Sequence, residues 1–115
     1  MMIYEGIDLS EWDTRTRDVV GKWGDLPQDR YDGWMGLYKG NAEQVEREYL
    51  KHIGMHVFNQ GSDSIRHDPQ KALELYQEAK GIFDLLLELG PMFWKNTREY
   101  IGHSDRHISY LEDRI

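Results

Sequence analysis

Apolar residues recur at helical spacing over most of the chain from Asn41 onward. In the first such segment, one side of a helix would carry Val45, Leu50, Ile53, Val57 and Phe58. Asn41, with Gln44 three residues later, is typical of a helix start, and Gly61 predicts the helix end. The segment is therefore expected to form an amphipathic helix.

Two further helices are expected after it. Asp68 and Pro69 have the residue types of an N-cap and a first helical position. The helix that follows has a broad apolar face, made of Ala72, Leu73, Leu75, Tyr76, Ala79, Ile82, Phe83, Leu86 and Leu87. Gly90 and Pro91 separate it from a last helix. The buried stripe of that helix is expected at Phe93, Trp94, Ile101, Ile108 and Leu111.

Residues 1–40 have a weaker pattern. A helix is expected from roughly residue 9 to residue 23, with Ser10 and Asp13 as a capping pair. The glycines and proline between Leu26 and Gly40 predict irregular structure. This stretch contains four apolar residues that are expected to pack as a flap on the helices: Trp34, Met35, Leu37 and Tyr38.

These elements predict an all-α fold with about four helices in a bundle. The 115 residues suit one domain, in which residues 1–40 form an aromatic-rich irregular segment with one helix and residues 41–115 a three-helix core. The chain is 39% hydrophobic and holds four Trp and seven Tyr, enough apolar area for a folded core.

The net charge of −7 excludes some classes of function. Lys and Arg are interspersed among acids, so direct nucleic-acid binding is not expected. The chain has no cysteine, which rules out disulfides and thiolate metal sites. Apolar runs are too short to span a membrane, no signal segment is evident, and no glycine-rich phosphate loop occurs. A soluble, cytoplasmic protein without a cofactor is expected.

One phrase occurs twice, at residues 47–56 and again at residues 98–107. Each copy spaces one Glu and two His four residues apart, giving the two triplets Glu48, His52, His56 and Glu99, His103, His107. Such stripes on two helices could hold a metal ion. At about 100° per residue, however, the first stripe points roughly 150–180° from its apolar face and the second roughly 70–110°. The stripes are therefore predicted to be solvated, with a metal site as the alternative.

Residues 50–80 resemble a single tetratricopeptide unit. The resemblance depends on Ile53-Gly54, Phe58, Gln60-Gly61, Asp68, Lys71-Ala72-Leu73, Tyr76 and Ala79. Small residues at positions 54, 72 and 79 would let two antiparallel helices approach closely. Six residues are inserted in the turn, and no second unit follows. The helices from 41 to 113 are also similar to the small bundle of microtubule-interacting-and-transport domains. Either resemblance implies a module that binds a peptide or a protein.

A different family is suggested by Arg98 and His103, which are separated by four residues. This spacing resembles the Arg-x4-His signature of HEPN ribonucleases, which are also helical bundles. The resemblance implies that the arginine stabilises phosphate charge and the histidine transfers a proton during RNA cleavage. Glu99 stands where a short polar residue is usual, and the negative net charge argues against RNA as a ligand.

The sequence therefore predicts a small acidic, non-enzymatic interaction module, acting as an adaptor or inhibitor that occupies the surface of a partner protein. The sequence is also compatible with a homodimer, and it leaves the ribonuclease and the metal-binding protein as alternatives. Aromatic residues are the predicted contacts, namely Trp34, Tyr38, Trp94 and Tyr100. Glu43 and Glu46 are expected to steer a partner with a basic surface.

Overall fold

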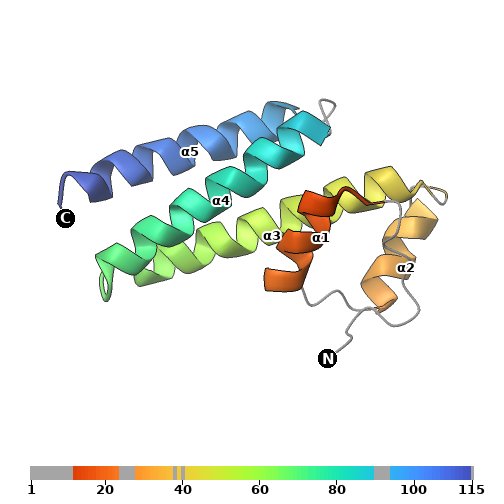
Figure 1. The fold of residues 1–115 in the computed structure, drawn as a ribbon, viewed down its shortest axis with the longest axis horizontal. Coiled ribbons are helices and arrows are strands. Elements are labelled where there is room, and N and C mark those ends of the chain that lie inside the picture. Colours follow the sequence, from red (N-terminus) through yellow and green to blue (C-terminus); the bar gives the residue numbers. More distant parts are fainter. Residues whose placement is uncertain (1–11, 24–27, 38, 40, 90–93, 115) are drawn as a thin grey trace.

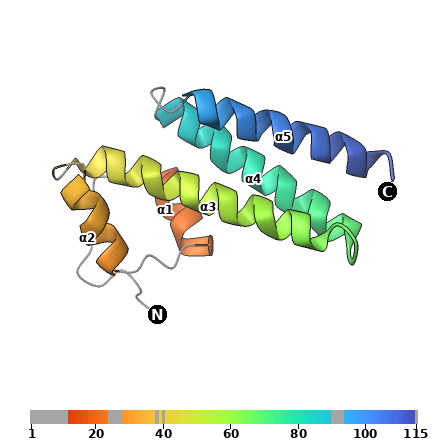
Figure 2. The same ribbon diagram turned by 180° about the vertical axis from the view of Figure 1, so that it is seen from behind.

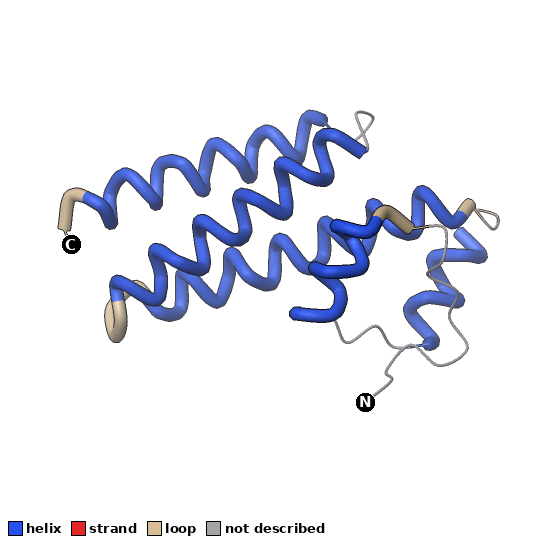
Figure 3. Tube along the Cα trace, in the orientation of Figure 1, coloured by secondary structure: helices blue, strands red, loops and turns tan. Residues whose placement is uncertain are grey.

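The computed structural model describes residues 12–23, 28–37, 39, 41–89 and 94–114. These ranges contain five helices and no strand (Figures 1 and 3). The helices are α1 (Thr14–Trp23), α2 (Gln28–Leu37), α3 (Ala42–Ser64), α4 (Pro69–Leu89) and α5 (Trp94–Glu112). The predicted all-α fold is confirmed. Within the same ranges, no helix has both the length and the apolar character that crossing a membrane requires.

The three long helices form the body of the structure. α4 packs against both α3 and α5 and lies between them in the view of Figure 2. The chain turns back after α3 and again after α4, so α3 and α5 run in the same direction (Figure 1). Much of the core comes from α4, whose Tyr76, Phe83 and Leu86 are fully buried.

The caps of α3 and α4 agree with the sequence. The Asn41 side chain accepts a hydrogen bond from the backbone N–H of Gln44 at 3.2 Å. Asp68 accepts one from the N–H of Lys71 at 3.1 Å, and Pro69 is the first residue of α4. The predicted end of α3 at Gly61 is wrong, because the helix continues to Ser64. Gly61 is buried instead, and an added Cβ would lie 3.2 Å from the Tyr76 ring.

Gly54 marks a close approach between α3 and α4. A Cβ at this position would lie 2.8 Å from the Phe83 ring, nearer than van der Waals contact allows. Ala72 and Ala79 are fully buried on α4, and Phe58 meets Tyr76 edge to face at 5.0 Å. The predicted close packing of these two helices on small residues is confirmed.

α1 is held to α3 by a buried carboxylate. Glu46 accepts hydrogen bonds from the Asp13 backbone N–H at 3.0 Å and from the Thr16 hydroxyl at 2.6 Å. Asp13 in turn caps α1, since its side chain accepts from the N–H of Arg15 at 2.9 Å. The helix thus begins at Thr14 rather than near residue 9, and Ser10 lies outside the described residues.

The expectation of irregular structure between residues 26 and 40 is wrong for Gln28–Leu37, which form α2. In Figures 1 and 2, α2 lies at a steep angle to the start of α3. Its half-buried Trp34 lies 6.0 Å from the Tyr49 ring and 4.9 Å from the His52 ring, measured between centroids. This packing outweighs the low helix propensity of Gly33 and Gly36. Leu37, expected in an apolar flap, is 68% exposed.

α5 approaches α4 through small polar residues that the apolar pattern does not reveal. Between Thr97 and Glu112, its buried positions are Thr97, Ser104 and Leu111, spaced seven residues apart. The Ser104 hydroxyl donates to the Tyr100 carbonyl at 2.8 Å, which satisfies it inside the helix. Ile101 and Ile108, predicted for the buried stripe, are half-buried beside it, and Phe93 lies outside the described residues.

The Tyr76 hydroxyl is fixed between α3 and α4, 2.8 Å from the Ser62 hydroxyl. Burial raises the pKa of the Tyr76 phenol above its usual value of 10.0, and Asp63 adds to this, although the Ser62 hydrogen bond acts in the opposite sense. The folded state therefore holds the phenol proton more tightly than the unfolded chain does. The resulting stability is present below pH 10 and is lost as the pH rises further.

We expect the urea midpoint of the wild-type protein to fall more steeply above about pH 10 than that of Tyr76→Phe, which has no phenol to ionise. The pKa of Lys80 is also raised, by its ion pair with Asp105, but this contribution is common to both proteins. Urea unfolding followed by circular dichroism from pH 8 to pH 11 measures the difference. Parallel curves for the two proteins would contradict the burial of this hydroxyl.

Candidate functional site

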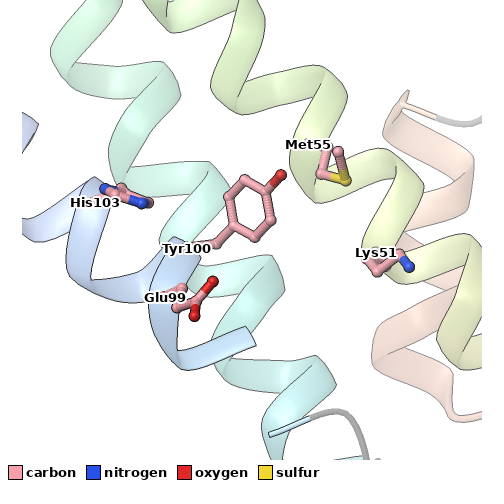
Figure 4. Close-up of a pocket in the computed structure, with 5 residues that line it drawn as sticks. All are labelled: Lys51, Met55, Glu99, Tyr100 and His103. Carbon is pink, nitrogen blue, oxygen red and sulfur yellow. The ribbon is translucent and has the colours of Figure 1, made fainter. Parts of the chain in front are cut away.

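Two hollows lie along α3 and α5, and together we call them the α3–α5 groove. Its first hollow, of about 370 Å³, is lined by Lys51, Met55, Glu99, Tyr100 and His103. Figure 4 shows that Lys51 and Met55 come from α3, whereas the other three residues come from α5. The Tyr100 side chain points from α5 toward α3 and Met55.

Helical spacing places these side chains on facing sides. Lys51 and Met55 are four residues apart on α3, and Glu99 and His103 are four apart on α5. Tyr100 is held by stacking on Phe83 of α4, with ring centroids 5.0 Å apart and planes inclined by only 12°. Because Phe83 is itself locked against Gly54, the aromatic surface of the first hollow is fixed before any ligand arrives.

A second hollow, of about 450 Å³, lies further along the same pair of helices. It is lined by Ile65 at the end of α3 and by Arg106, His107 and Tyr110 of α5. Phe58 lies between the two hollows, with its ring meeting Tyr100 at 6.0 Å and His107 at 5.4 Å, both edge to face. The α3–α5 groove therefore consists of two hollows separated by an aromatic ridge.

Charged groups lie along the α3–α5 groove. Arg106 has only donors, so its hydrogen bond with His103 requires the Nδ1 atom of His103 to accept, and this bond links the two hollows. On the facing wall, Lys51 lies 3.5 Å from Glu48. Glu99 forms no ion pair with a described residue. The lining therefore carries two permanent cations and one carboxylate.

The repeated Glu and His residues have separate environments. His52 packs on Trp34, whereas His56 is exposed and accepts from the Gln60 amide at 3.0 Å. His103 lines the first hollow, and His107 packs 4.8 Å from the Tyr76 ring with its Nδ1 donating to the His103 carbonyl.

No group of three His, Asp or Glu residues in the described part is arranged to hold a metal ion. The six residues named as an alternative metal site, Glu48, His52, His56, Glu99, His103 and His107, form no such group within this chain. The reason is that α2 covers part of the first stripe, while the second stripe faces the groove and the Phe58 ridge. Arg98 and His103, the pair with ribonuclease spacing, are both exposed on α5.

The predicted partner contacts also separate. Tyr100 lines the α3–α5 groove, Trp34 is half-buried in the contact between α2 and α3, and Glu43 is exposed. Glu46 was expected on the surface and is only 6% exposed, because its carboxylate binds the start of α1. Tyr38 lies outside the described residues, and of Trp94 only its place at the start of α5 is described.

Several lining residues were not predicted from the sequence, namely Lys51, Met55, Ile65, Arg106 and Tyr110. The available signal was a second aromatic and imidazole stripe on α5, offset from its apolar stripe. Tyr100, His103, His107 and Tyr110 recur every three or four residues, which indicates a helix with two packed or partly covered faces.

Comparison of the chain with models of protein families, with curated proteins and with solved structures gives no match. The tetratricopeptide-like and ribonuclease-like resemblances therefore stay predictions from the sequence. What this chain does must be argued from the groove itself.

Proposed function

We propose that this protein is a non-enzymatic interaction module whose α3–α5 groove holds an amphipathic helix of a partner protein. The observation that carries the proposal is the alignment of two hollows, on either side of the Phe58 ridge, between two helices that run in the same direction. Grooves between helices commonly receive a helix through apolar side chains spaced along one of its faces.

The spacing of the hollows matches two turns of a helix. Along α5 their linings are centred near Tyr100 and His107, seven residues apart, which corresponds to about 10 Å at 1.5 Å per residue. Apolar side chains at positions i and i+7 of a partner helix would therefore enter the two hollows. The Phe58 ridge would lie under the turn between them.

The charges favour a partner helix with acidic residues on its flanks. Lys51 lies on one wall, Arg106 on the other, and Glu99 is the single carboxylate among the lining residues. Carboxylates on the partner beside Lys51 and Arg106 would orient the helix and exclude strongly basic competitors. In this mechanism the module presents a preformed surface and acts by occupying its partner, as an adaptor or inhibitor does.

The proposal predicts that Met55→Glu weakens binding of such a helix at least about tenfold, because it replaces the aliphatic side chain of the first hollow with a carboxylate beside Tyr100. Peptides are selected against the folded protein from a library of helices with apolar residues fixed at i and i+7. Their affinities for each variant are then measured by fluorescence anisotropy. Leu37→Glu, which makes the same change at an exposed site on α2, is the matched control and should leave affinity within about twofold.

Circular dichroism of both variants confirms that the fold is retained before affinities are compared. Selected peptides that bind Met55→Glu and Leu37→Glu equally well would show that the α3–α5 groove is not their site. The proposal would also be overturned if the library yielded no peptide whose affinity is weakened by Met55→Glu.

A further inference from the structure

A separate depression lies between α1 and α4. It consists of two adjoining cavities of about 550 Å³ and 320 Å³, which share Val19 and Gly81 as lining residues. Apolar side chains from both helices contribute to its surface, namely Val19, Trp23, Ile82 and Leu85. We call this surface the α1–α4 strip. It has no lining residue in common with the α3–α5 groove.

The presence of a glycine at position 81 of the α1–α4 strip is not explained by the packing of the helices. Gly81 lies in the middle of α4, where glycine lowers helix stability relative to alanine. Nothing lies within 4 Å of the position that a Cβ would occupy, in contrast to Gly54, where Phe83 leaves no room. Packing within the described chain therefore does not require a glycine here. Its effect is to leave the backbone of α4 bare where the two cavities meet, which permits close approach by another backbone.

The charge around the strip is unbalanced. Four carboxylates line it, from Asp18, Glu78, Asp84 and Glu88, against two cations, Arg15 and Lys22. Lys22 pairs with Glu78, and Arg15 pairs with Glu88. Asp18 and Asp84, on opposite walls, form no ion pair with any described residue. The strip thus has an apolar floor, a bare backbone at its centre and an unpaired carboxylate on each side.

We infer that the α1–α4 strip docks a basic amphipathic helix. Apolar residues of that helix would cover Val19 and Leu85, a small residue would cross Gly81, and Lys or Arg side chains would pair with Asp18 and Asp84. This inference goes beyond the α3–α5 groove because it assigns a second surface of opposite charge preference. A chain with two such surfaces can bind two different partners at once, as an adaptor does.

The strip is tested with a synthetic helical peptide composed of Leu, Ala and Lys, and with a matched peptide in which Glu replaces Lys. Nuclear magnetic resonance titration of the full chain should shift amides of residues 15–23 and 78–88 with the basic peptide and not with the acidic one. Gly81→Leu should weaken the basic peptide at least about tenfold by blocking the close approach. Gly21→Leu is the matched control, since Gly21 is also exposed and unconfined on a helix but does not line the strip.

Thermal stability provides an independent measurement, because the same substitution should raise stability and lower peptide affinity. Gly81→Ala should raise the thermal midpoint by about 3–6 °C and nevertheless weaken the basic peptide. Asp84→Lys should abolish binding, whereas Asp113→Lys at the end of α5 should leave it within about twofold. Equal affinity for both peptides, or an unchanged affinity of Gly81→Leu, would overturn the inference, as would absence of binding below about 1 mM. Met55→Glu should not change the affinity of the basic peptide. The inference about the α1–α4 strip and the proposal about the α3–α5 groove can therefore fail independently.

Discussion

Replacing Phe83 by alanine is expected to lower the free energy of unfolding by about 3–5 kcal/mol. The Phe83 ring is fully buried, lies against Gly54 of α3, and stacks on Tyr100 of α5. It is therefore one of the side chains through which α4 contacts both of its long neighbours. Its removal would leave a cavity among three helices and would free the Tyr100 ring that lines the first hollow. Urea unfolding followed by circular dichroism measures the loss.

A double-mutant cycle sharpens this expectation. Gly54→Ala alone should cost about 1–3 kcal/mol, because its methyl group would overlap the Phe83 ring. In Gly54→Ala combined with Phe83→Ala, the smaller residue leaves room for that methyl group, so the pair should cost less than the sum of the single changes. Leu37→Ala, at an exposed site, should change stability by no more than about 0.5 kcal/mol. Strict additivity of the pair would show that α3 and α4 do not meet at this point.

The sequence was most informative where a structure depends on neighbouring residues. Asn41 and Asp68 act as helix caps because an N-cap needs only a short polar side chain and the next few backbone groups. The contact of Gly54 with Phe83 was also predictable in kind, since a small residue on an apolar face permits a close approach.

Features that depend on distant segments were not predictable in the same way. α2 contains two glycines and is stabilised by the contact of Trp34 with α3, which no local pattern reveals. Ser104 is buried although serine is a polar residue, because its hydroxyl donates a hydrogen bond to a backbone carbonyl of its own helix. Of the α3–α5 groove, only the α5 residues Glu99, Tyr100, His103 and His107 were singled out, because the facing wall depends on how the helices pack.

The second large effect is expected at Glu46, whose carboxylate is buried although its residue type predicts a surface position. Glu46→Ala should destabilise the contact of α1 with α3 by about 2–4 kcal/mol, because the Asp13 N–H and the Thr16 hydroxyl lose their acceptor while partly or fully buried. Glu46→Gln should lose less, since the amide oxygen still accepts but carries no charge. Hydrogen exchange resolves where the loss occurs.

Amides of α1 should lose protection in Glu46→Ala, whereas those of α3, α4 and α5 should keep most of theirs, because the three long helices share a core centred on α4. Glu43→Ala is the matched control on the same helix, as its carboxylate is exposed and pairs with Arg47 at 3.6 Å. Because α1 forms one wall of the α1–α4 strip, Glu46→Ala should also weaken the basic peptide without touching a lining residue. Unchanged exchange in α1 would mean that Trp12 and Val20 hold this helix without the carboxylate, and the link from Glu46 to the strip would then be lost.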